Sequence, residues 1–380
     1  MSAAPAFRAG QAVTRLALTD FRSYAALALD LDPAPVVLTG PNGAGKTNLL
    51  EALSFLAPGR GFRRVRLGDV TRLGGRGWSV FARIDGPRDA VEIGTGLVPT
   101  EEGSVERRAV HIDGADAGGG AALAGVAALD WLTPQMDRLF LESPGGRRRF
   151  LDRLVYGMVP NHARHVAAFE KAMRERQQLL RSGGGDAAWL AALETTMAEM
   201  GVVVAAARRE AMARLDAALA AGEGPFPRAV VAVTGYLEDA LAADPAVEVE
   251  DRYRAALAGS RSRDAEAGTT ALGPHRSDLL ARHAAKDMPA ERCSTGEQKA
   301  ILIAIVLANA RLTAARRALP PILLLDEIAA HLDTTRREAL AQAILSLGSQ
   351  AWLTGTDAAL FEGFRGHARF LTVRDGRLVG

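Results

Sequence analysis

The sequence predicts an α/β fold that contains a largely parallel sheet and an inserted helical block. Apolar strand-like runs alternate with helical patterns at both ends of the chain, at 35–39 and 46–56 and again at 322–325 and 335–347. Such alternation is typical of helices that cover a parallel sheet. A glycine-rich loop joins the first strand to its helix, and heptad-like apolar spacing replaces the strand pattern in between.

Composition limits the classes of protein to consider. The chain has 380 residues, enough for two domains or for one domain with a large insertion. Its formal net charge is only +2, so nucleic-acid binding would depend on local basic patches. The single cysteine, Cys293, excludes an internal disulfide and suits a reducing cytosol. Residues 1–13 lack a signal-peptide pattern and no apolar run reaches about 18 residues, so we expect a cytoplasmic protein without a membrane partner.

The N-terminal third predicts a hairpin, a buried strand and a helix. Rough alternation of apolar residues over 16–31 is typical of two antiparallel strands. The apolar run 35–39 predicts a short buried strand, and a helix follows over about 46–56. Segments interrupted by glycine over 60–120 predict further short strands.

The middle of the chain predicts helices. Apolar residues spaced three and four apart run from about 160 to 211, and Gly183, Gly184 and Gly185 interrupt them. The simplest structure is an antiparallel helical hairpin that turns at the glycines. A packed helical subdomain and a protruding coiled coil both fit this pattern. Residues 260–268 are polar and predict a loop.

The last third returns to alternating helices and strands, ending in a hairpin that turns at Asp375-Gly376. The helical block therefore interrupts one α/β fold. We expect a head, lobe I, formed by residues 1–145 and 269–380, and an inserted helical lobe II formed by residues 146–268.

The loop after the first buried strand matches the G-x-x-x-x-G-K-T phosphate-binding pattern in full. Its glycines let backbone N–H groups converge on phosphates, and the following helix adds its positive N-terminal end. We expect the lysine to pair with the β- and γ-phosphates of ATP and the threonine to bind Mg²⁺. The predicted nucleotide site consists of Gly40, Pro41, Asn42, Gly43, Ala44, Gly45, Lys46, Thr47 and Asn48.

Asp326 and Glu327 follow the buried strand 322–325. An acidic strand end complements a phosphate loop, because Asp326 can hold Mg²⁺ while Glu327 polarises the attacking water. An acidic pair at this place is in other proteins only a helix N-cap. The phosphate loop favours the catalytic interpretation, so we expect Lys46 and Glu327 to be catalytic.

Residues 294–299 read Ser-Thr-Gly-Glu-Gln-Lys and precede an apolar helix over 300–312. A serine hydroxyl and backbone N–H groups at such a helix start can bind phosphate oxygens. An ordinary serine N-cap with Glu297 as capping-box partner explains the same residues. Their place ahead of the Asp326–Glu327 strand favours a role beyond capping.

Together these motifs resemble the ABC-type ATPases of the SMC/Rad50-like DNA-repair branch, and within it the RecF family of bacterial recombination mediators. The resemblance covers nearly the whole chain and implies an ABC-type P-loop ATPase head with an inserted helical lobe. Besides the three motifs above, it rests on residues 21–24, 143–152, 273–278, 330–333 and 354–357. The Arg-Arg-Arg-Phe-Leu-Asp stretch at 147–152 and Gly-Pro-His-Arg at 273–276 are its most specific parts.

The resemblance implies contacts between two copies of the chain. Ser294, Gly296 and Gln298 would approach the γ-phosphate of the ATP held by the second copy. Residues 330–333 would cross the dimer interface, which would bring Asp333 near a nucleotide.

Three further positions follow from the same resemblance. Gln135 would sense Mg²⁺ and the γ-phosphate, as a catalytic and metal-site residue. Arg22 would approach the nucleotide from the first hairpin. Thr356 stands where transporter relatives have a switch histidine, which implies slow hydrolysis.

Two basic clusters favour DNA binding through backbone phosphates. One follows the phosphate-loop helix and the other lies on the first long helix: Arg60, Arg63, Arg64 and Arg66; Lys171, Arg174, Arg176 and Arg181. A plainly solvated helix face explains the second cluster equally well. Arg147, Arg148 and Arg149 would form a salt-bridge cluster with Asp152 between the lobes.

The resemblance implies an ATP-switched dimer that closes on double-stranded or gapped DNA and reopens on slow, DNA-stimulated hydrolysis. It implies work in recombinational repair of gapped or stalled replication DNA and in the SOS response, with RecO and RecR as partners. Two alternatives remain, the nucleotide-binding subunit of an ABC transporter and a DNA scaffold that binds ATP without hydrolysing it. The helical insertion, Thr356 and the arginines speak against the transporter, and Glu327 against the scaffold.

Overall fold

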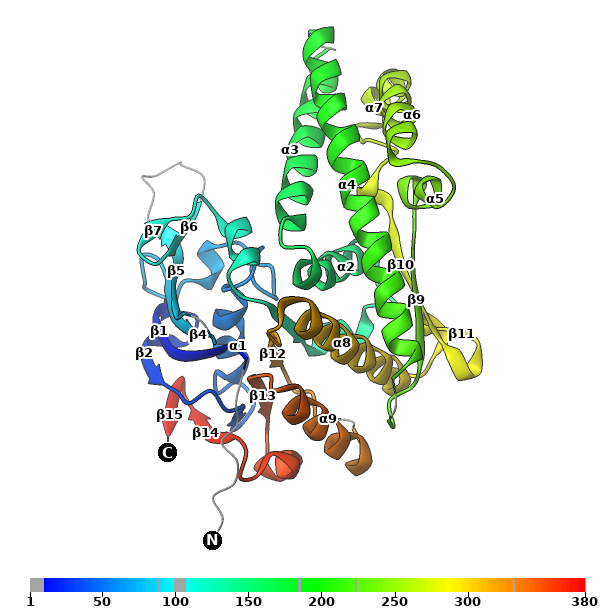
Figure 1. Ribbon diagram of the computed structural model, residues 1–380. Coiled ribbons are helices and arrows are strands. Elements are labelled where there is room, and N and C mark those ends of the chain that lie inside the picture. The colour runs from blue at the N-terminus through cyan, green and yellow to red at the C-terminus, as the bar shows by residue number, and fades with distance from the viewer. Residues whose placement is uncertain are drawn as a thin grey trace. The chain divides into compact units, whose positions relative to one another are not determined.

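The computed structural model describes residues 10–87, 89–98, 107–183, 186–222, 224–330 and 332–379. The chain divides into two compact units (Figure 1). Unit 1 contains the described residues of Met1–Asp137, Gly222–Pro227 and Ser294–Gly380. Unit 2 contains those of Arg138–Ala221 and Arg228–Cys293.

A six-stranded sheet in the order β15-β14-β3-β13-β12-β8 forms the centre of unit 1. All neighbours in it are parallel except the terminal pair β14–β15, and its middle strands are fully buried. The predicted strands and closing hairpin are confirmed, with Asp375 and Gly376 at positive φ as a tight hairpin turn requires. The strands are β3 (Val36–Thr39), β8 (Leu129–Leu132), β12 (Ile322–Leu325), β13 (Ala351–Gly355), β14 (Arg369–Arg374) and β15 (Arg377–Val379).

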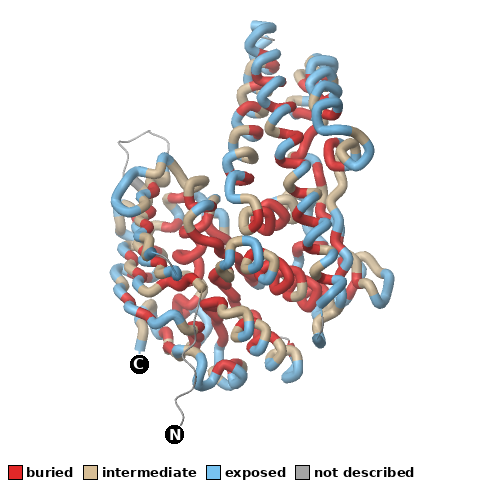
Figure 2. Tube along the Cα trace, in the orientation of Figure 1, coloured by how far each residue is buried: buried red, intermediate tan, exposed pale blue. Residues whose placement is uncertain are grey.

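Three helices accompany this sheet, and the predicted helices after 46, 300 and 335 are confirmed. Much of α8 is buried, including most of its apolar residues 300–308 (Figure 2). The helices are α1 (Lys46–Ser54), α8 (Thr295–Arg317) and α9 (Thr334–Leu347).

A second sheet of unit 1 is antiparallel, in the order β2-β1-β4-β5-β6-β7. The predicted hairpin over 16–31 is its first pair. Phe21 from this sheet meets Phe55 and Trp78 edge-on, at ring-centroid distances of 5.9 and 5.6 Å, which anchors the sheet beside the end of α1. The strands are β1 (Ala12–Phe21), β2 (Tyr24–Asp30), β4 (Ser79–Asp85), β5 (Val91–Val98), β6 (Arg107–Ile112) and β7 (Ala115–Asp116).

Unit 2 is mostly helical and has its own core. The long helices α3 and α4 lie side by side (Figure 1), and buried and exposed residues alternate along both (Figure 2). Leu237, Val249 and Tyr253 from later helices complete this core, so the long pair is part of a packed subdomain. The helices are α2 (Pro144–Met158), α3 (His162–Arg181), α4 (Ala187–Ala220), α5 (Tyr236–Ala243), α6 (Ala246–Gly259) and α7 (Arg261–Ala267).

A small sheet in the order β11-β10-β9 completes unit 2 and moves the predicted lobe boundary. β9 (Ala229–Thr234) pairs along its whole length with β10 (Asp278–His283), and β11 (Met288–Pro289) follows. Residues 269–293, expected in lobe I, therefore lie in unit 2, as do residues 138–145. No local sequence pattern predicts β9, so the sequence alone places its partner strand β10 in the head.

Two other expectations change in unit 2. Residues 261–267 form helix α7 instead of a loop, because Asp264 is buried and bonds Arg176 of α3. The helices α3 and α4 are separated at Gly183 as predicted, while Gly184 and Gly185 lie outside the described residues.

Among the described residues, two helices are long and apolar enough to cross a membrane, α4 and α8. Of their most apolar windows, 50% and 78% respectively are buried inside the protein. Both therefore have the character of core helices, which pass the same length and composition test.

Candidate functional site

The phosphate loop links β3 to α1 and has the backbone that its glycines permit. Gly40, Gly43 and Gly45 have φ of 141°, 80° and 112°, which L side chains rarely adopt. A Cβ on Gly40 would lie 2.2 Å from the Val373 carbonyl oxygen, and one on Gly45 would lie 2.9 Å from the Ser23 hydroxyl. Only glycine fits these two positions, so the backbone can take the tight turn that lets a phosphate approach closely.

Lys46 is the charged group of this loop. Its side chain folds back over the loop, where Nζ donates to the carbonyls of Gly40 at 2.7 Å and Pro41 at 2.9 Å. Burial lowers the pKa of Lys46, and the negative charges of Glu327 and Asp326 partly offset that effect. The ammonium thus lies in the electrostatic reach of both carboxylates.

Sheet order brings Asp326 to the phosphate loop. Because β13 lies between β3 and β12, the buried Thr354 of β13 stands between the two strand ends. Thr354 donates to Asp326 Oδ1 at 2.7 Å, and Thr47 donates to the same oxygen at 3.0 Å. Burial raises the pKa of Asp326, since these neutral hydroxyls only partly compensate its charge. A hydroxyl and a carboxylate oxygen are ligands that Mg²⁺ prefers.

Glu327 is held by its backbone. It has a φ of 49°, the left-handed region that non-glycine residues rarely occupy. Its N–H donates to the Thr354 hydroxyl at 2.8 Å, and its carbonyl accepts from the Ala330 N–H at 3.2 Å and from Lys299 Nζ at 3.4 Å. These backbone bonds therefore fix the Cα–Cβ direction of Glu327 at the edge of the sheet.

Gln135 lies at the same edge. β8 runs parallel to β12 with Leu132 opposite Leu325, and the Asp326 N–H donates to the Leu132 carbonyl at 2.9 Å. The 3-10 helix Pro134–Arg138 follows β8 directly and carries Gln135 exposed. Gln135, Thr47 and Asp326 thus come from three segments that meet at one edge.

The Ser294 turn begins α8. Ser294 is the N-cap, and the full capping box is present: Ser294 Oγ accepts from the Glu297 N–H, and the Ser294 N–H donates to Glu297. Ser294 and Gly296 are exposed, and a Cβ on Gly296 would meet no atom within 4 Å. Gln298 differs from the prediction, because it is only 3% exposed and does not share their open surface.

Two other predicted positions, Asp333 and Thr356, are exposed. Asp333 is exposed and caps α9 by accepting from the Arg336 N–H, while His331 lies outside the described residues. Thr356 is exposed just past β13.

Arg22 binds the buried Glu51 of α1 in a bidentate pair, at 2.9 and 2.8 Å. Arg63 binds the same carboxylate at 2.7 Å and the Asn48 side chain at 2.8 Å. Glu51 was not singled out from the sequence, because a lone acid in a helix carries no pattern.

Curated relatives match the chain over nearly its full length. The DNA replication and repair protein RecF of Mesorhizobium japonicum is 54% identical over 368 residues, covering 96% of each chain. That of Rhizobium meliloti is 52% identical over 371 residues, covering 97% of this chain and 98% of the relative. The chain belongs to the RecF family. A family model described as an AAA domain also matches residues 15–113.

Solved structures agree with the RecF fold. A structure described as the recombination mediator protein RecF-ATPrS in the RecFOR pathway superposes with a TM-score of 0.82 at 18% identity, covering 98% of both chains. An Smc head domain with an extended coiled coil from Pyrococcus furiosus reaches a TM-score of 0.55 at 18% identity. The fold is thus an α/β ABC-type ATPase head with a helical lobe, as the sequence predicts.

Within this RecF fold, the predicted DNA-binding residues fall into two groups. Arg60, Arg64 and Arg66 are exposed, and so are Lys171 and Arg174 with side chains 73% and 64% exposed. Arg176 is completely buried and binds Glu194 at 3.0 Å and Asp264 at 2.8 Å.

The prediction for Arg176 is therefore wrong, because a helix face that seemed solvated is covered by α7. Arg63 is likewise held by Glu51 and Asn48 and is not an open surface group.

The expected salt-bridge cluster of Arg147–Arg149 with Asp152 is also corrected. Arg147 binds Asp278 in a bidentate pair at 2.7 and 2.8 Å, and Arg148 donates to the Ser277 carbonyl. Asp152 instead binds Arg208 and His162, so all these bonds lie within unit 2.

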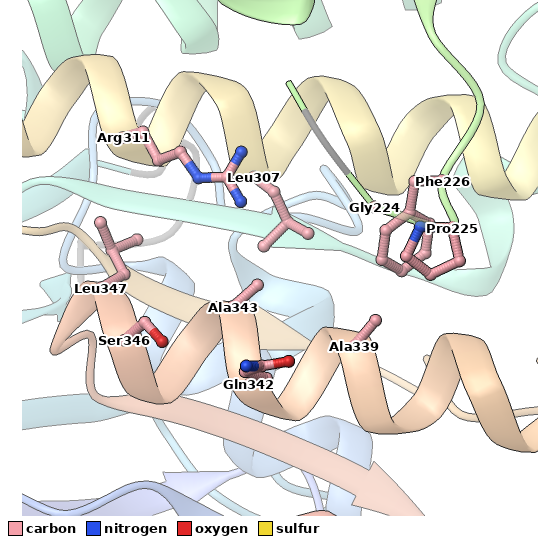
Figure 3. A pocket seen from close by; sticks show the side chains of 10 residues that line it. All are labelled: Gly224, Pro225, Phe226, Leu307, Arg311, Ala339, Gln342, Ala343, Ser346 and Leu347. Carbon is pink, nitrogen blue, oxygen red and sulfur yellow. The ribbon is translucent and has the colours of Figure 1, made fainter. Parts of the chain in front are cut away.

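A separate pocket of about 380 Å³ lies between α8 and α9 in unit 1 (Figure 3). Its lining is mostly apolar and includes Phe226, Leu307, Ala343 and Leu347, with Arg311 as its charged member. None of its lining residues belongs to the predicted nucleotide site.

Proposed function

We propose that the chain is an ATP-switched DNA-binding protein of recombinational repair. ATP bound at Gly40–Asn48 joins two copies on double-stranded or gapped DNA, and slow, DNA-stimulated hydrolysis separates them. RecO and RecR are the proposed partners at gapped or stalled replication DNA, in the cytoplasm and within the SOS response. Membership of the RecF family supports the repair role.

The convergence at Asp326 carries the proposal. Thr47 from the phosphate loop and Thr354 from the neighbouring strand both bond one oxygen of this buried carboxylate. A buried acid whose partners are uncharged is suited to a cation that arrives with the nucleotide. Thr47 and Asp326 would hold Mg²⁺, with Gln135 beside them, and Mg²⁺ would neutralise charge on the phosphates.

The chain's own residues supply the remaining chemistry. Lys46 turns from the loop carbonyls to the phosphates of ATP, and Glu327 accepts the proton of the attacking water. Arg22, fixed by Glu51, stands beside the loop helix. Thr356 supplies no imidazole to orient that water, so hydrolysis is slow. Slow hydrolysis suits a protein whose ATP-bound dimer must persist before it separates.

The Ser294 turn supports the dimeric switch. Ser294 and Gly296 are exposed on unit 1, and the capping box between Ser294 and Glu297 does not cover Gly296. Ser294, Gly296 and, after a local rearrangement, Gln298 would meet the γ-phosphate held by the second copy, with Asp333 at the same interface. Arg60, Arg64, Arg66, Lys171 and Arg174 remain the proposed DNA contacts.

Titration of a gapped duplex with and without ATP tests the proposal, with the mass of the protein measured in parallel. We expect ATP to raise DNA affinity and to produce dimers together. An ATP response of neither quantity would overturn the proposal. ATP binding without hydrolysis would favour the scaffold, and indifference to DNA would favour the transporter subunit.

A further inference from the structure

Lys299 is a buried lysine at the start of α8 that the proposed mechanism does not use. It is only 5% exposed and comes directly after Gln298, at the end of the Ser294 turn. Burial of an ammonium is costly unless acceptors surround it. Its Nζ has two such acceptors, the Glu327 carbonyl at 3.4 Å and Asp137 Oδ2 at 3.6 Å.

These two acceptors belong to different parts of the nucleotide site. Asp137 lies on the 3-10 helix Pro134–Arg138 that also carries Gln135. Glu327 ends β12 and carries the carboxylate of the proposed general base. All three groups lie in unit 1, so one ammonium joins α8, the helix that the Ser294 turn begins, to both segments.

The Glu327 peptide explains why such a bond would matter. A φ of 49° at a glutamate is strained and persists only where neighbours hold it. The N–H is held by Thr354, and the carbonyl is held by Ala330 and Lys299. Within the part of the chain that the structure describes, the hydrogen bond from Lys299 links this strained peptide to the helix of the Ser294 turn.

We propose that Lys299 is a positioning residue that couples the Ser294 turn to Glu327. Through its bonds to the Glu327 carbonyl and Asp137, a shift of α8 when the second copy binds would move the general base and the Gln135 helix together. Hydrolysis would then depend on dimer contact without Lys299 touching nucleotide. The inference rests on the proposed ATPase function and assigns a route from the interface to the catalytic base.

The experiment compares Lys299→Met and Lys299→Arg with wild type in the full chain. Methionine keeps much of the length but removes the charge, whereas arginine keeps a donor. We expect Lys299→Met to bind ATP with a dissociation constant within about twofold of wild type and to form ATP dimers. Its single-turnover hydrolysis should fall about tenfold or more, a fraction of the 10²–10⁴ that a positioned base contributes. Lys299→Arg should recover part of the rate.

Controls separate this role from simple stability. Lys286→Met changes an exposed lysine of unit 2 and should hydrolyse ATP like wild type. In a double-mutant cycle, Asp137→Asn should cost less in Lys299→Met than in wild type, because both changes remove the same ion pair.

An unchanged single-turnover rate in Lys299→Met would overturn the inference. So would a loss of ATP affinity matching the loss of rate, because that is the signature of general damage to the site. Absence of hydrolysis in wild type would instead count against the proposed ATPase function itself.

Discussion

Each unit contains a buried aspartate at a junction of several elements, and the two are treated in opposite ways. Asp326 in unit 1 is 4% exposed, and its partners among the described residues are two threonine hydroxyls. Asp152 in unit 2 is 7% exposed and accepts from Arg208 at 2.8 and 2.9 Å and from His162. Burial raises the pKa of Asp326. Burial would also raise that of Asp152, but the charge and bonds of Arg208, with His162, lower this pKa to about 2.

The contrast indicates that Asp152 is a structural carboxylate, whereas Asp326 is suited to bind a ligand. Asp152 is neutralised by its own chain, which joins α2 to α4 and holds unit 2 together. Asp326 has neutral hydrogen-bond partners, and the positive charges of Lys46 and Arg63 offset its burial only in part, at a cost in stability. A buried acid left in this state is suited to a cation that binds with the nucleotide.

Asp152→Asn should give the largest change in stability. It leaves the guanidinium of Arg208 buried without its bidentate carboxylate, and breaking such a pair costs about 3–5 kcal/mol. Hydrogen exchange should show faster opening of α2 and α4, while the sheet of unit 1 stays protected. Asp251→Asn, which removes an exposed partner of Arg254, should change the free energy of unfolding by no more than about 0.5 kcal/mol. Equal effects of the two substitutions would contradict the contrast.

Acidification should destabilise unit 2 through the same residue. The folded-state pKa of about 2 lies below the unfolded value of about 3.9, so this stabilisation is present above about pH 4 and is lost as the pH falls toward 2. It corresponds to about 2–3 kcal/mol. Exchange rates of α2 measured from pH 5 to pH 2.5 should show it, and Asp152→Asn should flatten the dependence. A profile that stays as steep in the variant would assign the loss to other groups.

Asp326→Asn should change stability less than Asp152→Asn and in the opposite direction. Because the amide oxygen can still accept from Thr47 and Thr354, the variant mainly removes the cost of burying the charge and its repulsion from Glu327. We expect the melting temperature at pH 7.5 to rise slightly, by the equivalent of about 1 kcal/mol, and the added stabilisation by Mg²⁺ with ATP to be mostly lost. A lower melting temperature without nucleotide would show that the carboxylate is already compensated.

Lys46→Ala should remove ATP affinity, because its ammonium is the only basic side chain within the phosphate loop 40–48. Isothermal titration of ATP measures this directly. Normal binding by the variant would discredit the assignment of the loop.

Local patterns predicted the sheet and the phosphate loop of unit 1 well. The spacing of Gly40, Gly45 and Lys46, the strand before Asp326 and the Asp375-Gly376 turn are all short-range signals. Thr354 could be placed within a family motif, but its bonds to Asp326 depend on sheet order, which no local pattern contains.

Long-range pairing explains what the sequence did not reveal. The burial of Arg176 requires Glu194 and Asp264, which are 18 and 88 residues away. The lobe boundary depends on the pairing of β9 with β10, and the Lys299 bonds join α8 to segments on either side of it in sequence. Such partners come together only in the folded chain.

The most direct test of the two-copy switch is the mass of the protein in the presence of ATP. It is measured for wild type, Ser294→Arg and Glu327→Gln, and ATP binding is determined in parallel. The account predicts ATP-dependent dimers for wild type and longer-lived dimers for Glu327→Gln. Ser294→Arg should remain monomeric while binding ATP normally, because its hydroxyl acts on the nucleotide of the other copy. Loss of ATP binding by the Ser294→Arg monomer would show that the turn serves its own subunit and would contradict the account.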